Sequence, residues 1–134
     1  MEFFLTGYQC TVVPRGSLLG PLLVNMFIND LNFVVHVSSL RLYADDTTAY
    51  ASNANITALE LSLNQDLEKL SSWFSSNHLT VNGKKTQAMI LGNSAQEPVL
   101  QIGDPPIEIN DSLNILSVHI DNKLSFKDHI SAIL

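Results

Sequence analysis

The stretch Leu40-Arg41-Leu42-Tyr43-Ala44-Asp45-Asp46-Thr47-Thr48-Ala49-Tyr50-Ala51 decides how this chain folds. Residues 40–44 alternate apolar and polar positions, as a half-buried strand does, and residues 47–51 are rich in β-branched and aromatic side chains. Two such runs joined by two residues predict a β-hairpin over roughly residues 39–51. Its tip is Asp45-Asp46.

This tip is unusual for a tight turn. A two-residue hairpin turn favours Gly or Asn, because its central residues adopt positive φ. Adjacent carboxylates also repel each other unless a cation lies between them. Poor turn chemistry and poor electrostatics together indicate a metal site. An ordinary turn with both carboxylates facing water fits the local pattern equally well.

Three further segments surround the hairpin: Val13–Leu23 before it, then Leu79–Thr86 and Ile115–Asp121 after it. In this order, the segments and the hairpin resemble the reverse transcriptases of non-LTR (LINE-type) retrotransposons, which are RNA-directed DNA polymerases. The resemblance runs from about Val13 to the C-terminus. Because it rests on several motifs in the right order, it is far more specific than the Tyr-Ala-Asp-Asp motif alone.

The resemblance implies an α+β fold, namely a partial polymerase palm in which helices pack on one face of an antiparallel sheet. Residues 1–134 would form a single partial reverse transcriptase domain. Within it, residues 13–92 would form the palm core, and residues 93–134 would form post-palm β-hairpins and the start of the thumb or connection. The first palm strand and the fingers would be missing.

The same resemblance implies a two-metal nucleotidyl transfer, in which carboxylates hold Mg²⁺ (or Mn²⁺) against phosphate oxygens. It makes Asp45 and Asp46 the catalytic and metal-binding residues, with Asp45 the closer ligand. Before them the only acids are Glu2 and Asp30, and neither matches the motif that supplies the family's third carboxylate. We therefore expect weak cation binding and no useful polymerase activity from the chain alone.

Five residues are assigned by resemblance to nucleotide or template binding: Arg15, Gly16, Ser17, Tyr43 and Lys85. The family usually has Gln where Arg15 stands, and a guanidinium cannot present an amide acceptor. Each assignment has a structural alternative. Gly16 and Ser17 also fit a turn and a helix cap, and Lys85 fits a solvated lysine after an Asn-Gly turn. For Tyr43 we rank cross-strand packing first.

Periodicity predicts the remaining elements. A helix runs from Ser17 to about Leu31, and a second runs from a Thr57–Glu60 capping box to about Asn77. Apolar residues of the second helix fall on one face, whereas its charged residues, Asp66 among them, fall mostly off it. Further elements are a short strand near Phe3–Leu5, a strand at 87–91, a small hairpin over 98–109, a strand at 113–120 and a helix start at 125–134.

The charge composition restricts which partners the chain can bind by itself. Seven basic and thirteen acidic residues give a net charge of −6, whereas a protein that grips a nucleic acid duplex usually has a basic face. We expect the RNA template, DNA primer and dNTP to be partners of the intact enzyme only. One cysteine fits an intracellular setting, and no stretch is long and apolar enough for a membrane span.

Two other interpretations remain. The chain could be a non-catalytic folded remnant that acts at most as an interaction scaffold. Its missing front strand would then leave a sheet edge exposed, which favours self-association. It could also be another enzyme with acids on a palm-like hairpin, such as a nucleotide cyclase, but the Pro14–Ser17 segment and Lys85-Thr86 argue against that class.

Overall fold

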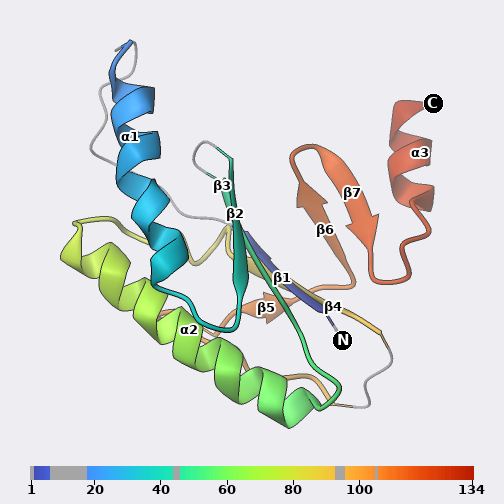
Figure 1. Ribbon diagram of the computed structural model, residues 1–134. Coiled ribbons are helices and arrows are strands. Elements are labelled where there is room, and N and C mark those ends of the chain that lie inside the picture. Colours follow the sequence, from blue (N-terminus) through green and yellow to red (C-terminus); the bar gives the residue numbers. More distant parts are fainter. Residues whose placement is uncertain (1, 7–17, 44–45, 93–95, 105) are drawn as a thin grey trace.

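The computed structural model describes residues 2–6, 18–43, 46–92, 96–104 and 106–134. It is a mixed structure of helices and antiparallel strands, as the sequence predicted (Figure 1). In chain order its elements are β1 (Glu2–Thr6), α1 (Gly20–Ile28), the 3-10 helix η1 (Asn29–Phe33), β2 (Ser39–Tyr43), β3 (Asp46–Ser52), α2 (Ile56–Ser76), β4 (Gln87–Leu91), β5 (Glu108–Ile109), β6 (Ser112–Ile115), β7 (Val118–Asp121) and α3 (Lys127–Ile133).

Five strands form one sheet in the order β2-β3-β1-β4-β5. The pairs β2–β3, β3–β1 and β1–β4 are antiparallel, and the short β5 adds to β4 in parallel. The first six strands and helices therefore follow the order β-α-β-β-α-β, which is the ferredoxin-like arrangement. Helix α2 lies across one face of this sheet (Figure 1).

The position of β1 corrects one prediction. We expected a sheet without a strand at its front, but Glu2–Thr6 pairs on both sides, with β3 and with β4. In this place the backbone of β1 pairs with a neighbouring strand on each side. The predicted open edge is filled, and β2 and β5 are the edge strands of the described sheet.

Helix α2 confirms the longest predicted helix but begins at a different cap. The N-cap is Asn55, whose side chain accepts hydrogen bonds from the backbone N–H groups of Thr57 and Ala58. The predicted capping box was wrong, because Asn55 already satisfies these donors and places Thr57 inside the first turn. The predicted apolar face is buried against the sheet: Leu59, Leu63, Leu67, Leu70 and Phe74.

Asp66 is the main exception to the predicted pattern of α2, because it is buried (1% exposed) rather than off the buried face. Its carboxylate accepts hydrogen bonds from the backbone N–H groups of His36, Val37 and Ser38 at 2.7–3.1 Å, and from the Ser38 hydroxyl at 2.9 Å. Burial by itself raises the pKa of Asp66, but these hydrogen bonds outweigh it and lower the pKa. Asp66 thus ties the loop before β2 to α2.

Helix α1 begins later than predicted, at Gly20, with Pro21 in its first turn where a missing N–H costs nothing. It continues as η1 to Phe33. Ile28 and Leu31 join the core, and the Phe27 ring contacts Trp73 of α2 at 5.5 Å between centroids. The rest of α1 extends away from the sheet (Figure 1).

The C-terminal part differs from prediction in one place. The single strand expected over 113–120 is a hairpin of β6 and β7. Its two turn residues, Leu116 and Ser117, have φ of 49° and 68°. Met89 of β4 and Leu113 of β6 are both fully buried outside the main core cluster, so this hairpin covers part of the sheet face opposite α2.

The predicted hairpin over 98–109 is present in reduced form, as one bridge between Gln101 and Pro106 and a hydrogen bond from Ile107 N–H to the Leu100 carbonyl at 2.8 Å. The predicted terminal helix is α3. The turn before it is held by Asp121, whose carboxylate accepts the backbone N–H groups of Lys123, Ser125 and Phe126. Hydrogen bonding, chiefly from Ser125, lowers the pKa of Asp121 to about 2.

The β6–β7 turn gives a first testable prediction. Positive φ at both central residues is the geometry of a type I′ turn, which favours Asn-Gly, whereas Leu and Ser are strained there. We expect Leu116→Asn combined with Ser117→Gly to raise the free energy of unfolding by about 1 kcal/mol. Urea denaturation followed by circular dichroism measures this. An unchanged or lower midpoint would show that the turn is not strained.

Candidate active site at the hairpin tip

The predicted hairpin is confirmed, but Asp46, predicted as a turn residue, is the first residue of β3 and pairs with Tyr43. β2 and β3 pair from Ser39–Tyr50 to Tyr43–Asp46, and two residues join them at the tip. Asp46 and Tyr43 are both exposed, and Tyr43 is 67% exposed. The ring of Tyr43 is thus not buried by cross-strand packing, which is the role that we ranked first. Asp45 lies outside the described residues.

Strand alternation gives the hairpin two different faces. Thr47, Ala49 and Ala51 are buried on the face that α2 covers. Tyr43 and Asp46 lie on the opposite face, because residues paired across a ladder share a face. The second acid of the tip therefore stands on the open face of the sheet, where a substrate has access to it.

Arg41 shares this open face and was missed by the sequence predictions. Its guanidinium lies over the Tyr50 ring, 5.5 Å from the centroid, and donates a hydrogen bond to the Leu40 carbonyl at 3.2 Å. The signal that would have found it is the alternation itself, since Arg41 stands two residues before Tyr43. The guanidinium therefore lies toward Tyr50, four residues along β3 from Asp46, and not beside the acid tip.

Lys85 lies at the same end of the sheet. Gln87, the first residue of β4, is level with Thr48 of β3, since both pair with Thr6 of β1. Lys85, two residues earlier, is exposed in a turn closed by hydrogen bonds to the Asn82 carbonyl. Two strand spacings separate β4 from β3, which is roughly 10 Å. The predicted residues Arg15, Gly16 and Ser17 lie outside the described part of the chain.

Among the described residues, no third carboxylate lies at this end of the sheet. Glu2 pairs with Ser52, six residues along β3 from Asp46, which is a separation of roughly 20 Å. Asp30 lies in η1. Within the described ranges no three His, Cys, Asp or Glu side chains gather as a metal group would need. The described residues therefore do not complete a divalent-cation site.

The structure brings two histidines together. The rings of His119 on β7 and His129 on α3 lie 6.3 Å apart between centroids. The His119 backbone N–H donates to Nδ1 of His129 at 3.4 Å. Within the described ranges no third potential metal ligand joins this pair.

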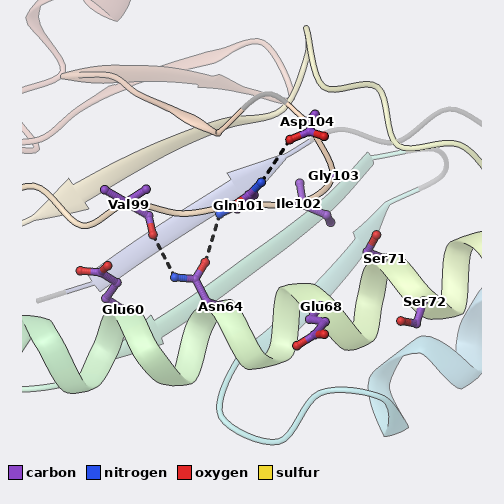
Figure 2. Close-up of a pocket in the computed structure, with 10 residues that line it drawn as sticks. All are labelled: Glu60, Asn64, Glu68, Ser71, Ser72, Val99, Gln101, Ile102, Gly103 and Asp104. Atoms are coloured by element: carbon purple, nitrogen blue, oxygen red, sulfur yellow. Dashed lines mark hydrogen bonds between the residues drawn. The ribbon is translucent and has the colours of Figure 1, made fainter.

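A groove lies elsewhere, between α2 and residues 99–104 (Figure 2). Its volume is about 620 Å³, and Asn64 bridges its walls through hydrogen bonds to the Val99 carbonyl and the Gln101 N–H. Its charged lining residues are Glu60, Glu68 and Asp104. No cationic side chain lines this groove, so its own charges disfavour phosphate groups.

Comparison with known proteins identifies the family. The family model described as "Reverse transcriptase (RNA-dependent DNA polymerase)" matches residues 6–120. This chain belongs to that family, as its motifs predicted. Among the described residues, no helix is long and apolar enough to cross a membrane.

Two curated relatives are similar over most of the chain. The "RNA-directed DNA polymerase from mobile element jockey" of Drosophila melanogaster is 26% identical over an alignment 141 residues long, which covers 95% of this chain and 15% of that protein. The protein of the same description from Drosophila funebris is 25% identical over 129 residues, or 90% of this chain and 14% of that protein. Jockey is a non-LTR element, so the predicted branch of the family is supported. No solved structure shows a significant match.

Proposed function

We propose that this chain is part of the palm of an RNA-directed DNA polymerase from a non-LTR retrotransposon. The intact enzyme would copy an RNA template by adding dNTPs to a DNA primer. One observation carries this proposal: the Tyr43–Asp46 pair closes an antiparallel hairpin at the end of a five-stranded sheet. A rigid sheet that presents acids at a hairpin tip can hold a reaction centre in a fixed position.

Asp45 and Asp46 would supply two carboxylates for Mg²⁺ or Mn²⁺ in the intact enzyme, because hard cations prefer carboxylate oxygens. The described residues do not complete that site, since Glu2 lies at the far end of β3. The remaining ligand would therefore come from another part of the polymerase. For the same reason we propose that this chain is inactive by itself.

Other residues of this end of the sheet would contact the substrates. The exposed ring of Tyr43 would contact the primer end. Lys85 would offer a positive charge to the triphosphate, and the segment Arg15-Gly16-Ser17 would approach the nucleotide and the template base. Supporting this arrangement, β3 and β4 bring Asp46 and the turn that holds Lys85 to one end of the sheet.

Cation binding tests this proposal on the chain as it is. We expect Mn²⁺ titration, followed by electron paramagnetic resonance, to show weak binding with a Kd of about 1 mM. The double variant Asp45→Asn and Asp46→Asn should lose this binding. Asp104→Asn, which removes an acid from the distant groove, should leave it unchanged. Equal binding by the double variant would contradict the proposed site.

Primer extension completes the test. With an RNA template, a DNA primer and either cation, we expect no incorporation by the 134-residue chain. Incorporation that Asp45→Ala abolishes would contradict the proposed inactivity and would show a complete site. A remnant that acts only as an interaction scaffold would show neither extension nor cation binding that depends on Asp45 and Asp46.

A further inference from the structure

Helix α1 has a second apolar face that nothing in the described structure covers. Its inner face carries Ile28, which is 2% exposed. On the opposite side four residues recur at helical spacing and remain exposed. This outer stripe consists of Leu19 (65% exposed), Leu22 (56%), Leu23 (60%) and Met26 (68%).

The outer stripe has the spacing of a helix–helix seam. Its members stand at positions i, i+3, i+4 and i+7, which is the pattern that packs one helix against another. A helix that is apolar on both sides is normally buried on both sides. The inner side of α1 already contacts α2 through the Phe27 and Trp73 rings, so only the outer stripe needs a partner.

The area involved is that of a stable interface. Leu18 (97% exposed) precedes the outer stripe by one residue. Taking roughly 150–250 Å² for a fully exposed large side chain, Leu18 and the four stripe residues together expose on the order of 700 Å², which is close to one partner's share of a standard protein interface. Isolated apolar patches on monomers are usually smaller than this.

Charge favours a second copy of this chain as the partner. The chain carries a net charge of −6, so most of its surface repels another copy. Residues 18–29 contain no ionisable side chain, so this is a place where two copies can approach without repulsion. A stripe of one helix against the same stripe of another is also self-complementary, as a two-fold dimer requires.

We propose that two copies of this chain associate through the outer stripes of α1, as a two-fold dimer of packed helices. This replaces the sheet edge that the sequence predicted as the surface for self-association, because β1 fills that edge. The proposal does not depend on polymerase activity. It predicts a dimer whether or not the hairpin tip binds cations.

Sedimentation equilibrium of the full chain over micromolar concentrations tests the dimer. Leu23→Glu should lower the association constant at least about 100-fold, because it places charges at the centre of the interface. Leu61→Glu is the matched control, because Leu61 is an equally exposed leucine (65%) on another helix, and it should leave the association unchanged. Circular dichroism checks that both variants fold.

A second variant protects the test against misfolding. Replacing Leu22, Leu23 and Met26 by alanine removes most of the stripe but keeps a strong helix former at each position, and it should also give a monomer. A wild-type chain that is monomeric at every concentration would overturn the proposal. So would a dimer that survives Leu23→Glu, a dimer that Leu61→Glu also abolishes, or assembly without limit beyond the dimer.

Discussion

Replacing Asp66 by alanine should lower the free energy of unfolding by about 3 kcal/mol, because three backbone N–H groups lose their acceptor in a buried place. Asp66 is 1% exposed and accepts from His36, Val37 and Ser38. Urea denaturation measured at pH 7 gives the difference. A loss below about 1 kcal/mol would mean that water replaces the carboxylate in these hydrogen bonds.

Two controls separate the hydrogen bonds from the ion pair of Asp66. Lys69 lies 3.7 Å from the carboxylate and is 41% exposed, so Lys69→Ala should cost less than about 1 kcal/mol. Asp66→Asn keeps one acceptor oxygen and nearly the same volume, so its loss should fall between the other two. If Lys69→Ala equalled Asp66→Ala, the ion pair rather than the backbone contacts would dominate.

The same residue predicts the response to acid. The pKa of Asp66 is lowered in the folded chain, so at acidic pH its carboxyl group is protonated less there than in the unfolded chain. Its contribution is therefore complete above the unfolded pKa of about 3.9 and is lost as the pH falls through the lower folded value. The difference in stability between the wild-type chain and Asp66→Asn should be constant above about pH 5 and should shrink below about pH 4.

Phe74→Ala should cost about 4 kcal/mol, because it empties a large volume at the end of α2. Phe74 is 4% exposed, and its ring meets Trp73 edge-on at 5.5 Å between centroids. Its carbonyl also accepts the Leu79 N–H at 2.8 Å where the helix ends. Chemical denaturation monitored by Trp73, the single tryptophan, reports both unfolding and the local change.

Leu61→Ala is the matched control for this prediction. Leu61 belongs to the same helix but is 65% exposed, so its truncation should change stability by less than about 0.5 kcal/mol. If both variants lost similar stability, the loss would reflect the helix itself rather than the core beneath it. If Phe74→Ala lost less than about 2 kcal/mol, the surrounding side chains would have collapsed into the space.

The strongest local patterns gave correct elements. Alternation around Tyr43 placed the hairpin within a residue at each end, and the apolar repeat from Leu59 to Phe74 placed α2 and its buried face. Both patterns repeat many times within a short window, so one ambiguous residue does not change the result. The motifs around the hairpin also gave the correct family.

Other features depended on contacts between distant segments. Periodicity put Asp66 off the buried face because it counts only positions along α2, whereas the hydrogen bonds come from residues 36–38. In the same way, no residue pattern near Phe3 indicates that its strand lies between β3 and β4. The β6–β7 turn was read as continuous strand because Leu and Ser rarely adopt positive φ.

By itself, then, the sequence determined the family, the hairpin with its acid tip and the apolar face of α2, because each depends on neighbouring residues. Only the tertiary structure decided which strand fills the middle of the sheet, which acid is buried and which is exposed, and which face of α1 is left uncovered. These features depend on burial and backbone pairing between residues far apart in the chain. Local periodicity does not indicate which distant residues will be in contact.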